Sequence, residues 1–155
     1  MSGMNPGSTN RLPLSAEMSG GTLRMIAKYL LVWFLLAIIA VANGIVRQAT
    51  YSKSVSDLAA HQISTVTAIL ATGAAVWFVH RSWTIESSSQ AWTIGLLWLL
   101  MTATFEFGFG HYIAGHSWAR LLADYNVLNG RVWSLFLVWI AIMPYVFFRL
   151  AARAA

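Results

Sequence analysis

Four long apolar runs are the feature that most constrains the fold of this chain. They cover residues 25–46, 59–79, 91–110 and 132–148, and polar connections separate them. An α-helix rises about 1.5 Å per residue, so about 20 apolar residues cross a hydrocarbon core about 30 Å thick. Each run is close to this length. The sequence therefore predicts an all-α protein, an integral membrane four-helix bundle, in one domain over residues 23–150.

The composition agrees with burial of these runs in lipid. Hydrophobic residues make up 58% of the 155 residues and charged residues only 10%, whereas a soluble domain has roughly 25% charged residues. A domain of this size has too little interior to hold the excess apolar surface. The chain has no cysteines, which excludes disulfide exchange, thiol catalysis and thiolate metal sites.

The net charge of +5 does not indicate nucleic-acid binding, because the basic residues lie beside the apolar runs. Arg24 and Lys28 stand at the first run, Arg81 follows the second, and Arg149 and Arg153 follow the last. Such residues anchor helix ends to anionic headgroups. We therefore expect the lipid bilayer as a partner and no nucleic acid.

The distribution of Lys and Arg also predicts an orientation. In a chain that crosses four times, both termini and the middle connection lie on one side of the membrane. That side carries six of the ten Lys and Arg residues, and the first and third connections carry the other four. Cytoplasmic loops are enriched in Lys and Arg. We expect both termini in the cytoplasm.

The polar stretch at 1–22 precedes the first run and contains Pro6 and Pro13. It cannot bury enough apolar surface to offset the entropy of ordering, so we predict a disordered tail. The first run has a competing interpretation as a cleaved signal peptide, with a small-residue cleavage site at 40–42. The length of the tail and the continuation of the run to Val46 favour a retained helix.

The second run is the most polar of the four and is rich in small and hydroxyl-bearing residues. Such residues permit close packing and interhelical hydrogen bonds, so we expect this helix at the packed centre of the bundle.

The connection between the third and fourth runs contains a further predicted helix. Ser117 can cap its start and Gly130 can end it. Apolar residues recur at three- and four-residue spacing within it, which predicts an amphipathic helix at 117–129 in the membrane interface. On its polar side, Arg120 and Asp124 stand four residues apart and are expected to pair weakly.

The predicted hairpins gather polar side chains at one membrane boundary, where the first and third helices end and the second and fourth begin. The opposite boundary offers far fewer. The candidate binding residues at this polar face are Asn43, Arg47, His61, Gln62, Glu106, His111, His116, Asp124, Asn126 and Arg131.

Glu106 is the most informative of these residues. It lies about one turn inside the end of the third run, between Phe105 and Phe107. A carboxylate at membrane depth is expensive and normally faces a partner or water, which makes it a functional candidate. The competing interpretation is structural: Glu106 is solvated at headgroup level, or it pairs with Arg47 or Arg131.

His111, His116 and Glu106 together have donor atoms that suit zinc, iron or copper. The two histidines are five residues apart, which places them about 140° apart around a helix, so they share no face. The favoured alternative is an interfacial histidine bonded to backbone or lipid. We therefore predict no metal site and no cofactor, and keep these three residues as weak candidates.

Several short motifs resemble those of a family of small, uncharacterised bacterial four-helix integral membrane proteins. The resemblance implies a four-helix fold and a multi-pass location in a bacterial inner membrane, and it brings no activity with it. The motifs are FEFGFGHY at 105–112, GHSW at 115–118, LLADYN at 121–126 and GRVW at 130–133, with a fainter likeness at 42–44 and 61–65.

These observations leave two main hypotheses for function. The first is an accessory or structural subunit that packs against a larger membrane complex or forms a homo-oligomer. The alternative is a membrane-embedded site around Glu106 that binds or transports a small molecule, lipid or metal. A third hypothesis, movement of protons or ions, has only one intramembrane acid to support it. The sequence contains no known catalytic motif, so no enzymatic activity is predicted.

Overall fold

The computed structural model of this chain describes residues 14–154, and no strand occurs within them. The all-α fold is therefore confirmed for this part of the chain. The elements, in order, are α1 (Leu14–Ala49), α2 (Asp57–Ser82), α3 (Ser88–Gly108), the π-helix η1 (Phe109–Ile113), α4 (Trp118–Ala123), the 3-10 helix η2 (Val127–Asn129) and α5 (Trp133–Ala154).

Four of the described helices are long and apolar enough to cross a membrane, and they coincide with the four apolar runs. Several extend beyond the run because polar residues cap them. Ser56 Oγ accepts a hydrogen bond from Ala59 N (3.2 Å) at the start of α2. Ser87 Oγ accepts one from Gln90 N (3.2 Å) at the start of α3. Each cap satisfies an amide that has no partner within the helix.

The first helix begins earlier than the sequence pattern predicts. α1 starts at Leu14, so the prediction of a disordered tail over 1–22 extends too far. Gly20 and Gly21 lower helix propensity by about 1 kcal/mol each, but they lie within a helix that is continuous with the apolar run. The rest of the predicted tail lies outside the described residues.

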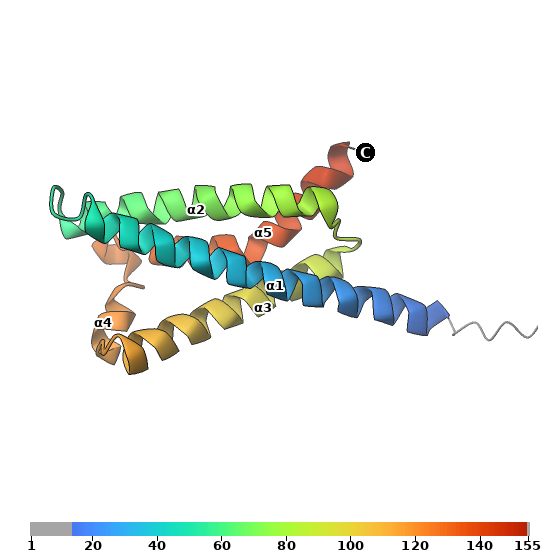
Figure 1. The fold of residues 1–155 in the computed structure, drawn as a ribbon, viewed down its shortest axis with the longest axis horizontal. Coiled ribbons are helices and arrows are strands. Elements are labelled where there is room, and N and C mark those ends of the chain that lie inside the picture. Colours follow the sequence, from blue (N-terminus) through green and yellow to red (C-terminus); the bar gives the residue numbers. More distant parts are fainter. Residues whose placement is uncertain (1–13, 155) are drawn as a thin grey trace, which may run out of the picture.

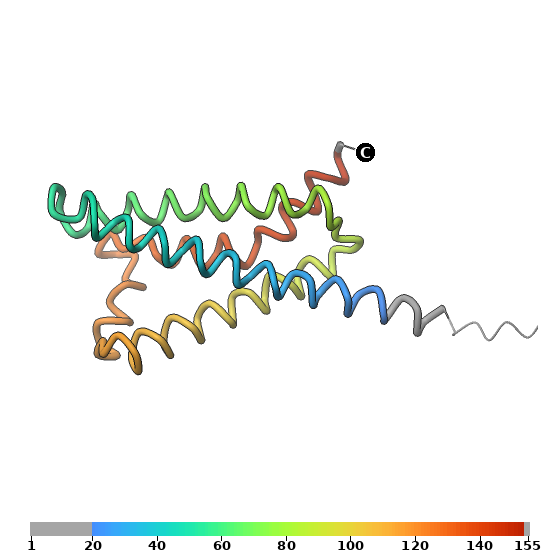
Figure 2. Tube along the Cα trace, viewed as in Figure 1, coloured from blue at the N-terminus to red at the C-terminus, as the bar shows by residue number. Residues whose placement is uncertain are grey.

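The long helices form a bundle that opens toward one end. α1 and α2 form a hairpin, and α5 packs against both α2 and α3. α3 crosses α1 and then separates from it toward the end of the molecule that carries α4 (Figures 1 and 2). The chain from η1 to η2 bridges this widening space (Figure 1). The result is a wedge between α1 and α3.

The narrow part of the bundle holds the core. Trp98, Tyr29, Ile140 and Met143 are fully buried. The Trp98 indole donates a hydrogen bond to the Tyr29 carbonyl (2.7 Å), and the Tyr29 hydroxyl donates one to the Trp83 carbonyl (2.7 Å). These bonds link α3 to α1, and α1 to the connection before α3.

The closest approach of two helices occurs at Gly95 of α3. A Cβ atom built on Gly95 would lie 1.9 Å from the carbonyl oxygen of Ala141 in α5. Only glycine allows the two backbones to come this close.

The second helix was predicted to lie at the packed centre of the bundle, and one face of α2 is packed in this way. α2 buries Ser64, Thr65 and Thr72 against its neighbours. It also exposes large apolar residues on the opposite face, including Val66 and Leu70. The face of α2 that carries these three hydroxyl side chains therefore packs against the bundle, and the opposite face presents large apolar side chains outward.

The predicted interfacial helix at 117–129 is broken into two short pieces. Ser117 does cap its start, and Gly130 ends it in the left-handed conformation (φ 77°), both as predicted. However, α4 ends at Ala123, and a turn separates it from η2. The predicted pairing of Asp124 with Arg120 is also wrong, because Asp124 Oδ1 lies 3.1 Å from Arg131 Nη1.

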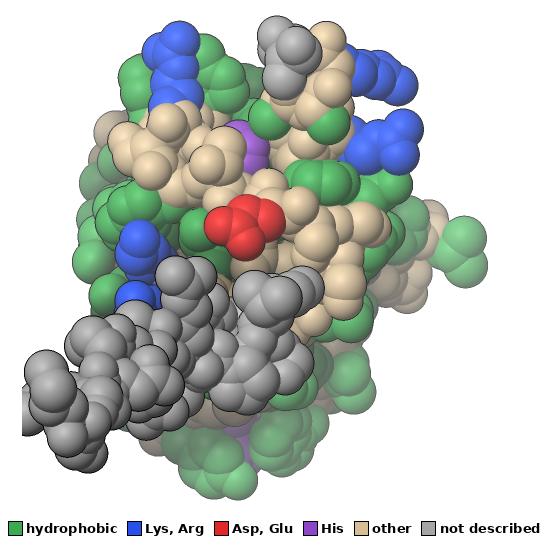
Figure 3. Space-filling view, turned by 90° about the vertical axis from the view of Figure 1, so that its right-hand side faces the viewer, with side chains coloured by type: hydrophobic (Ala, Val, Ile, Leu, Met, Phe, Trp, Pro, Cys, Tyr) green, Lys and Arg blue, Asp and Glu red, His purple; other side chains and the backbone are tan. Residues whose placement is uncertain are grey.

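The opposite end of the bundle carries basic residues. Figure 3 views this end and shows Lys and Arg side chains around its edge, with one acidic side chain nearer the middle. Arg81 lies over the Trp77 ring (4.3 Å) and Lys28 over the Trp83 ring (5.3 Å). Such cation–π contacts hold basic side chains beside aromatic rings at the helix ends.

Candidate functional site

Glu106 lies in the last turn of α3, and its carboxylate is held by two neutral donors. The Tyr125 hydroxyl donates a hydrogen bond to Glu106 Oε2 (2.6 Å), and the Trp133 indole N–H donates another to the same oxygen (2.8 Å). Its other oxygen, Oε1, accepts no hydrogen bond from the described residues and is not sealed off from open space. One oxygen of this carboxylate therefore has two hydrogen-bond donors, and the other has none among the described residues.

The segment that bridges the wedge brings the two donors to Glu106. Tyr125 lies in the turn after α4, and its ring stacks on that of Phe107 (5.6 Å between centroids). Ser134 Oγ donates a hydrogen bond to the Tyr125 carbonyl (3.3 Å). Trp133 is the first residue of α5. The break in the predicted helix thus places Tyr125 over the end of α3.

Burial raises the pKa of Tyr125 above its ordinary value, and the hydrogen bond to Glu106 raises it further. Both effects favour the neutral phenol. Tyr125 is therefore a stable donor to the carboxylate.

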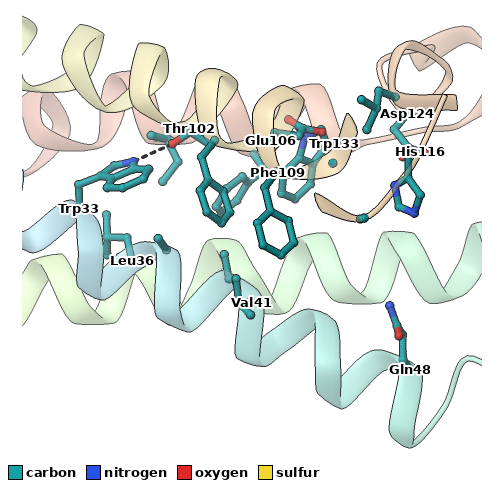
Figure 4. Close-up of a pocket in the computed structure, with 18 residues that line it drawn as sticks. Trp33, Leu36, Val41, Gln48, Thr102, Glu106, Phe109, His116, Asp124 and Trp133 are labelled. Carbon is teal, nitrogen blue, oxygen red and sulfur yellow. Dashed lines mark hydrogen bonds between the residues drawn. The ribbon is translucent and has the colours of Figure 1, made fainter. Parts of the chain in front are cut away.

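A cavity of about 440 Å³ lies in the wedge beside Glu106. This volume is within the usual range for small-molecule sites. The Trp33 indole donates a hydrogen bond to Thr102 Oγ1 (3.0 Å), and this bond ties α1 to α3 at one end of the cavity (Figure 4). Figure 4 shows Phe109 pointing toward α1 across the space from Val41.

The other end of the cavity is polar. Gln48 of α1, His116 and Asp124 line it together with Glu106. Gln48 and His116 point toward the same open space (Figure 4). The remaining lining is mostly apolar and includes Leu36, Ala37, Ala40, Phe105, Leu121, Phe136 and Ile140.

The predicted partners of Glu106 are engaged elsewhere. Arg131 Nη2 lies 3.1 Å from Asp57 Oδ2, and its Nη1 lies 3.1 Å from Asp124 Oδ1. Arg47 Nη1 donates a hydrogen bond to His61 Nδ1 (3.0 Å). The structural interpretation in which Glu106 pairs with Arg47 or Arg131 is therefore wrong. The ion pairs instead join α2 to the chain between α4 and α5.

Three of the candidate amide side chains connect or cap elements. Asn43 Nδ2 donates hydrogen bonds to the carbonyl (2.7 Å) and hydroxyl (2.9 Å) oxygens of Ser64, which join α1 to α2. Gln62 Nε2 donates one to the Gly130 carbonyl (3.1 Å). Asn126 Oδ1 accepts one from Asn129 N (3.3 Å) and caps η2. These contacts give Asn43, Gln62 and Asn126 structural roles.

The two candidate histidines have different surroundings. The His111 ring stacks on that of Trp118 (4.1 Å between centroids), and its Nδ1 donates a hydrogen bond to the His116 carbonyl (2.9 Å). His116 lines the cavity and His111 does not. No group of three or more His, Asp or Glu residues within the described part of the chain has the arrangement of a metal site.

The sequence pattern did not identify three residues of this site. Tyr125 and Trp133 have a ready explanation as interfacial aromatics, and Gln48 belongs to a stretch predicted to be a connection. A usable signal did exist: a carboxylate away from water needs donors, and Tyr and Trp supply them without adding charge.

Comparison of this chain with protein-family models, with curated proteins and with solved structures found no match. The resemblance of its motifs to a bacterial four-helix family therefore stays a prediction.

Proposed function

We propose that this chain crosses a bacterial inner membrane four times, with both termini in the cytoplasm, and binds a small molecule in the cavity beside Glu106. The observation that carries the proposal is the half-satisfied carboxylate. Tyr125 and Trp133 occupy Oε2, while Oε1 has no hydrogen-bond partner among the described residues, and Glu106 lines a cavity of about 440 Å³. A ligand that donates a hydrogen bond to Oε1 would complete the set of partners that a carboxylate requires away from water.

The charge around the cavity supports the same proposal. Asp124 is paired with Arg131, and Arg131 also contacts Asp57. No Lys or Arg lies within ion-pair distance of Glu106 among the described residues. A positively charged or hydrogen-bond-donating ligand is therefore complementary to the site, whereas an anion is not.

The role of an accessory or structural subunit stays a prediction. Leu31, Phe34 and Ile38 of α1 are exposed, but lipid can cover such a face as well as a partner helix can.

Native mass spectrometry of the chain extracted in mild detergent tests the proposal. We expect the wild-type chain to retain a bound small molecule, and Ala40→Phe to lose it because Ala40 lines the cavity. Ala71→Phe is the matched control, because Ala71 is exposed on α2. Glu106→Gln should lower the bound fraction without lowering membrane abundance. Equal retention by the wild type, Ala40→Phe and Glu106→Gln would contradict the proposal.

A further inference from the structure

An apolar groove on the outer side of α1 adjoins the cavity beside Glu106. This groove has a volume of about 450 Å³, and its lining presents no polar surface. It shares four lining residues with the cavity, namely Trp33, Ala37, Val41 and Phe105. Its other lining residues include Phe34, Ile38 and Ile45, which are exposed. These four shared side chains therefore stand between the outer surface of α1 and the cavity that Glu106 lines.

The cavity and the groove, taken together, have one polar end and one apolar end. Glu106, Gln48 and His116 stand at the polar end. At the apolar end, Trp33 and Phe34 pack edge to face (5.2 Å), as do Trp33 and Phe105 (6.1 Å). A ligand that fills both parts needs a compact polar head and a slender apolar tail.

We infer that the ligand is a single-chain amphiphile whose head is an ammonium or hydroxyl group and whose tail lies between α1 and α3. This inference rests on the proposed binding function and names its ligand class. The head donates to Glu106 Oε1. The tail reaches the cavity sideways, from the bilayer, through the groove lined by Ala37 and Val41.

The head, more than the tail, decides which molecule is bound. Lipid tails are as apolar as the groove, so an alkyl chain that moves from the bilayer into the groove gains little from the hydrophobic effect. The bilayer interior offers no acceptor like the free carboxylate oxygen of Glu106, so the head gains a hydrogen bond only in the cavity. A hydrogen bond to a charged group contributes about 1.5–3 kcal/mol, which corresponds to about tenfold or more in affinity. An anionic head is rejected, because it would stand beside the Glu106 carboxylate, and none of the described Lys or Arg residues lies within ion-pair distance of that carboxylate.

Photolabelling of the full chain in phosphatidylcholine nanodiscs tests the inference. The probes are three twelve-carbon alkyl chains that carry a diazirine and differ only in the head: an amine, an alcohol or a carboxylate. Peptide mapping locates the labelled residues. The amine and alcohol should label the groove residues Val41 and Phe105 at least about tenfold more than the carboxylate does. All three should label Leu70, an exposed residue of α2, equally as bilayer background.

Two variants sharpen the test. Glu106→Gln should abolish the preference for the amine over the carboxylate at Val41, since the charge is removed while the shape is kept. Ala37→Phe should lower groove labelling by all three probes, and Ala71→Phe should leave it unchanged. Labelling at Leu70 should not change in Glu106→Gln or Ala37→Phe, which reports that α2 is still inserted in the bilayer.

The outcomes separate this inference from the proposed function. Equal or stronger groove labelling by the carboxylate would overturn the ligand class, while the pocket itself would still be occupied. No preference for Val41 and Phe105 over Leu70 with any probe would overturn sideways entry of an alkyl chain. In either case a bound molecule that Ala40→Phe removes in native mass spectrometry would still support a small-molecule site.

Discussion

At the scale of single residues, the environment of Glu106 is distinctive because its partners are neutral. A cation beside a buried carboxylate neutralises the charge and closes the site. Tyr125 and Trp133 instead orient the carboxylate and leave its charge uncompensated. An unpaired charge away from water is costly, so a hydrogen-bond donor from outside the chain would stabilise this carboxylate.

The pH dependence of stability should report the contact between Tyr125 and Glu106. The folded chain raises the pKa of Tyr125 above the value of about 10 for a free phenol. Above about pH 10 the unfolded chain has released this proton and the folded chain still holds it, so stability falls as pH rises. The stability that the neutral phenol contributes is fully present below about pH 10.

Tyr125→Phe isolates this effect. At neutral pH the variant should be less stable than the wild type by about 1.5–3 kcal/mol, because a hydrogen bond to a charged group is lost. Between about pH 10 and pH 11 this difference in the free energy of unfolding should become smaller. Only the wild type has a phenol whose proton is held in the folded chain and released in the unfolded chain, so only the wild type loses stability from it as pH rises. Thermal unfolding in detergent at a series of pH values measures it. A difference that stays constant with pH would show that Tyr125 is not held as a donor.

The sequence allowed most residues of this candidate site to be predicted, but not which of them contact one another. Glu106 stood out because it is a carboxylate inside an apolar run. Arg131 and Arg47 were equally plausible partners from position alone. What directs Arg131 to Asp57 and Asp124 is the three-dimensional path of the chain from α4 to α5, and no local pattern encodes that path.

At the scale of helices, length and composition predicted the four long helices well, because the length of an apolar run is a local property of the sequence. The 117–129 segment shows where this reasoning fails. Its apolar spacing predicts one continuous helix, yet the chain turns after Ala123. The turn lets Tyr125 reach Glu106, and a contact with a residue nineteen positions away outweighs local propensity.

The crossing of α3 and α5 at Gly95 gives a prediction for stability. Gly95→Ala would place a Cβ atom 1.9 Å from the Ala141 carbonyl oxygen, so the helices must move apart. We expect a loss of about 1–3 kcal/mol in the free energy of unfolding, the usual cost of overpacking a core. Thermal or denaturant unfolding in mild detergent measures this change.

Gly44→Ala is the matched control for Gly95→Ala. Gly44 lies within α1, and a Cβ atom there would meet nothing within 4 Å. Alanine favours a helix over glycine by roughly 0.5–1 kcal/mol, so this variant should be as stable as the wild type or slightly more stable. Destabilisation by both substitutions to a similar extent would contradict close packing at Gly95.

At the scale of the whole molecule, the absence of cysteine from the sequence makes the proposed topology directly testable. Single cysteines can be placed as Ser54→Cys before α2, Thr84→Cys before α3 and Leu128→Cys before α5. All three positions are exposed, and Leu128 is 98% exposed. A membrane-impermeant maleimide added to intact bacterial cells should label the cysteines at 54 and 128 and leave that at 84 unlabelled.

Inverted membrane vesicles should give the opposite pattern. Labelling of only the cysteine at 84 in intact cells would keep four crossings and reverse the proposed orientation. Labelling of the cysteines at 54 and 84 from the same side would contradict four crossings, because α2 would then not span the membrane.

The hydrogen bond from Trp33 to Thr102 holds α1 and α3 together at the narrow end of the wedge. The tie is short and fixed at 3.0 Å, whereas Gln48 lies fifteen residues farther along α1, a distance of roughly 22 Å at the rise of an α-helix. A rotation of α1 by about 5° about the Trp33–Thr102 bond would therefore displace Gln48, at the wide end of the wedge, by roughly 2 Å. The two bonded side chains would barely move. Near this end of α1, Asn43 and Arg47 bond to Ser64 and His61 of α2, so these contacts limit how far the opening can widen.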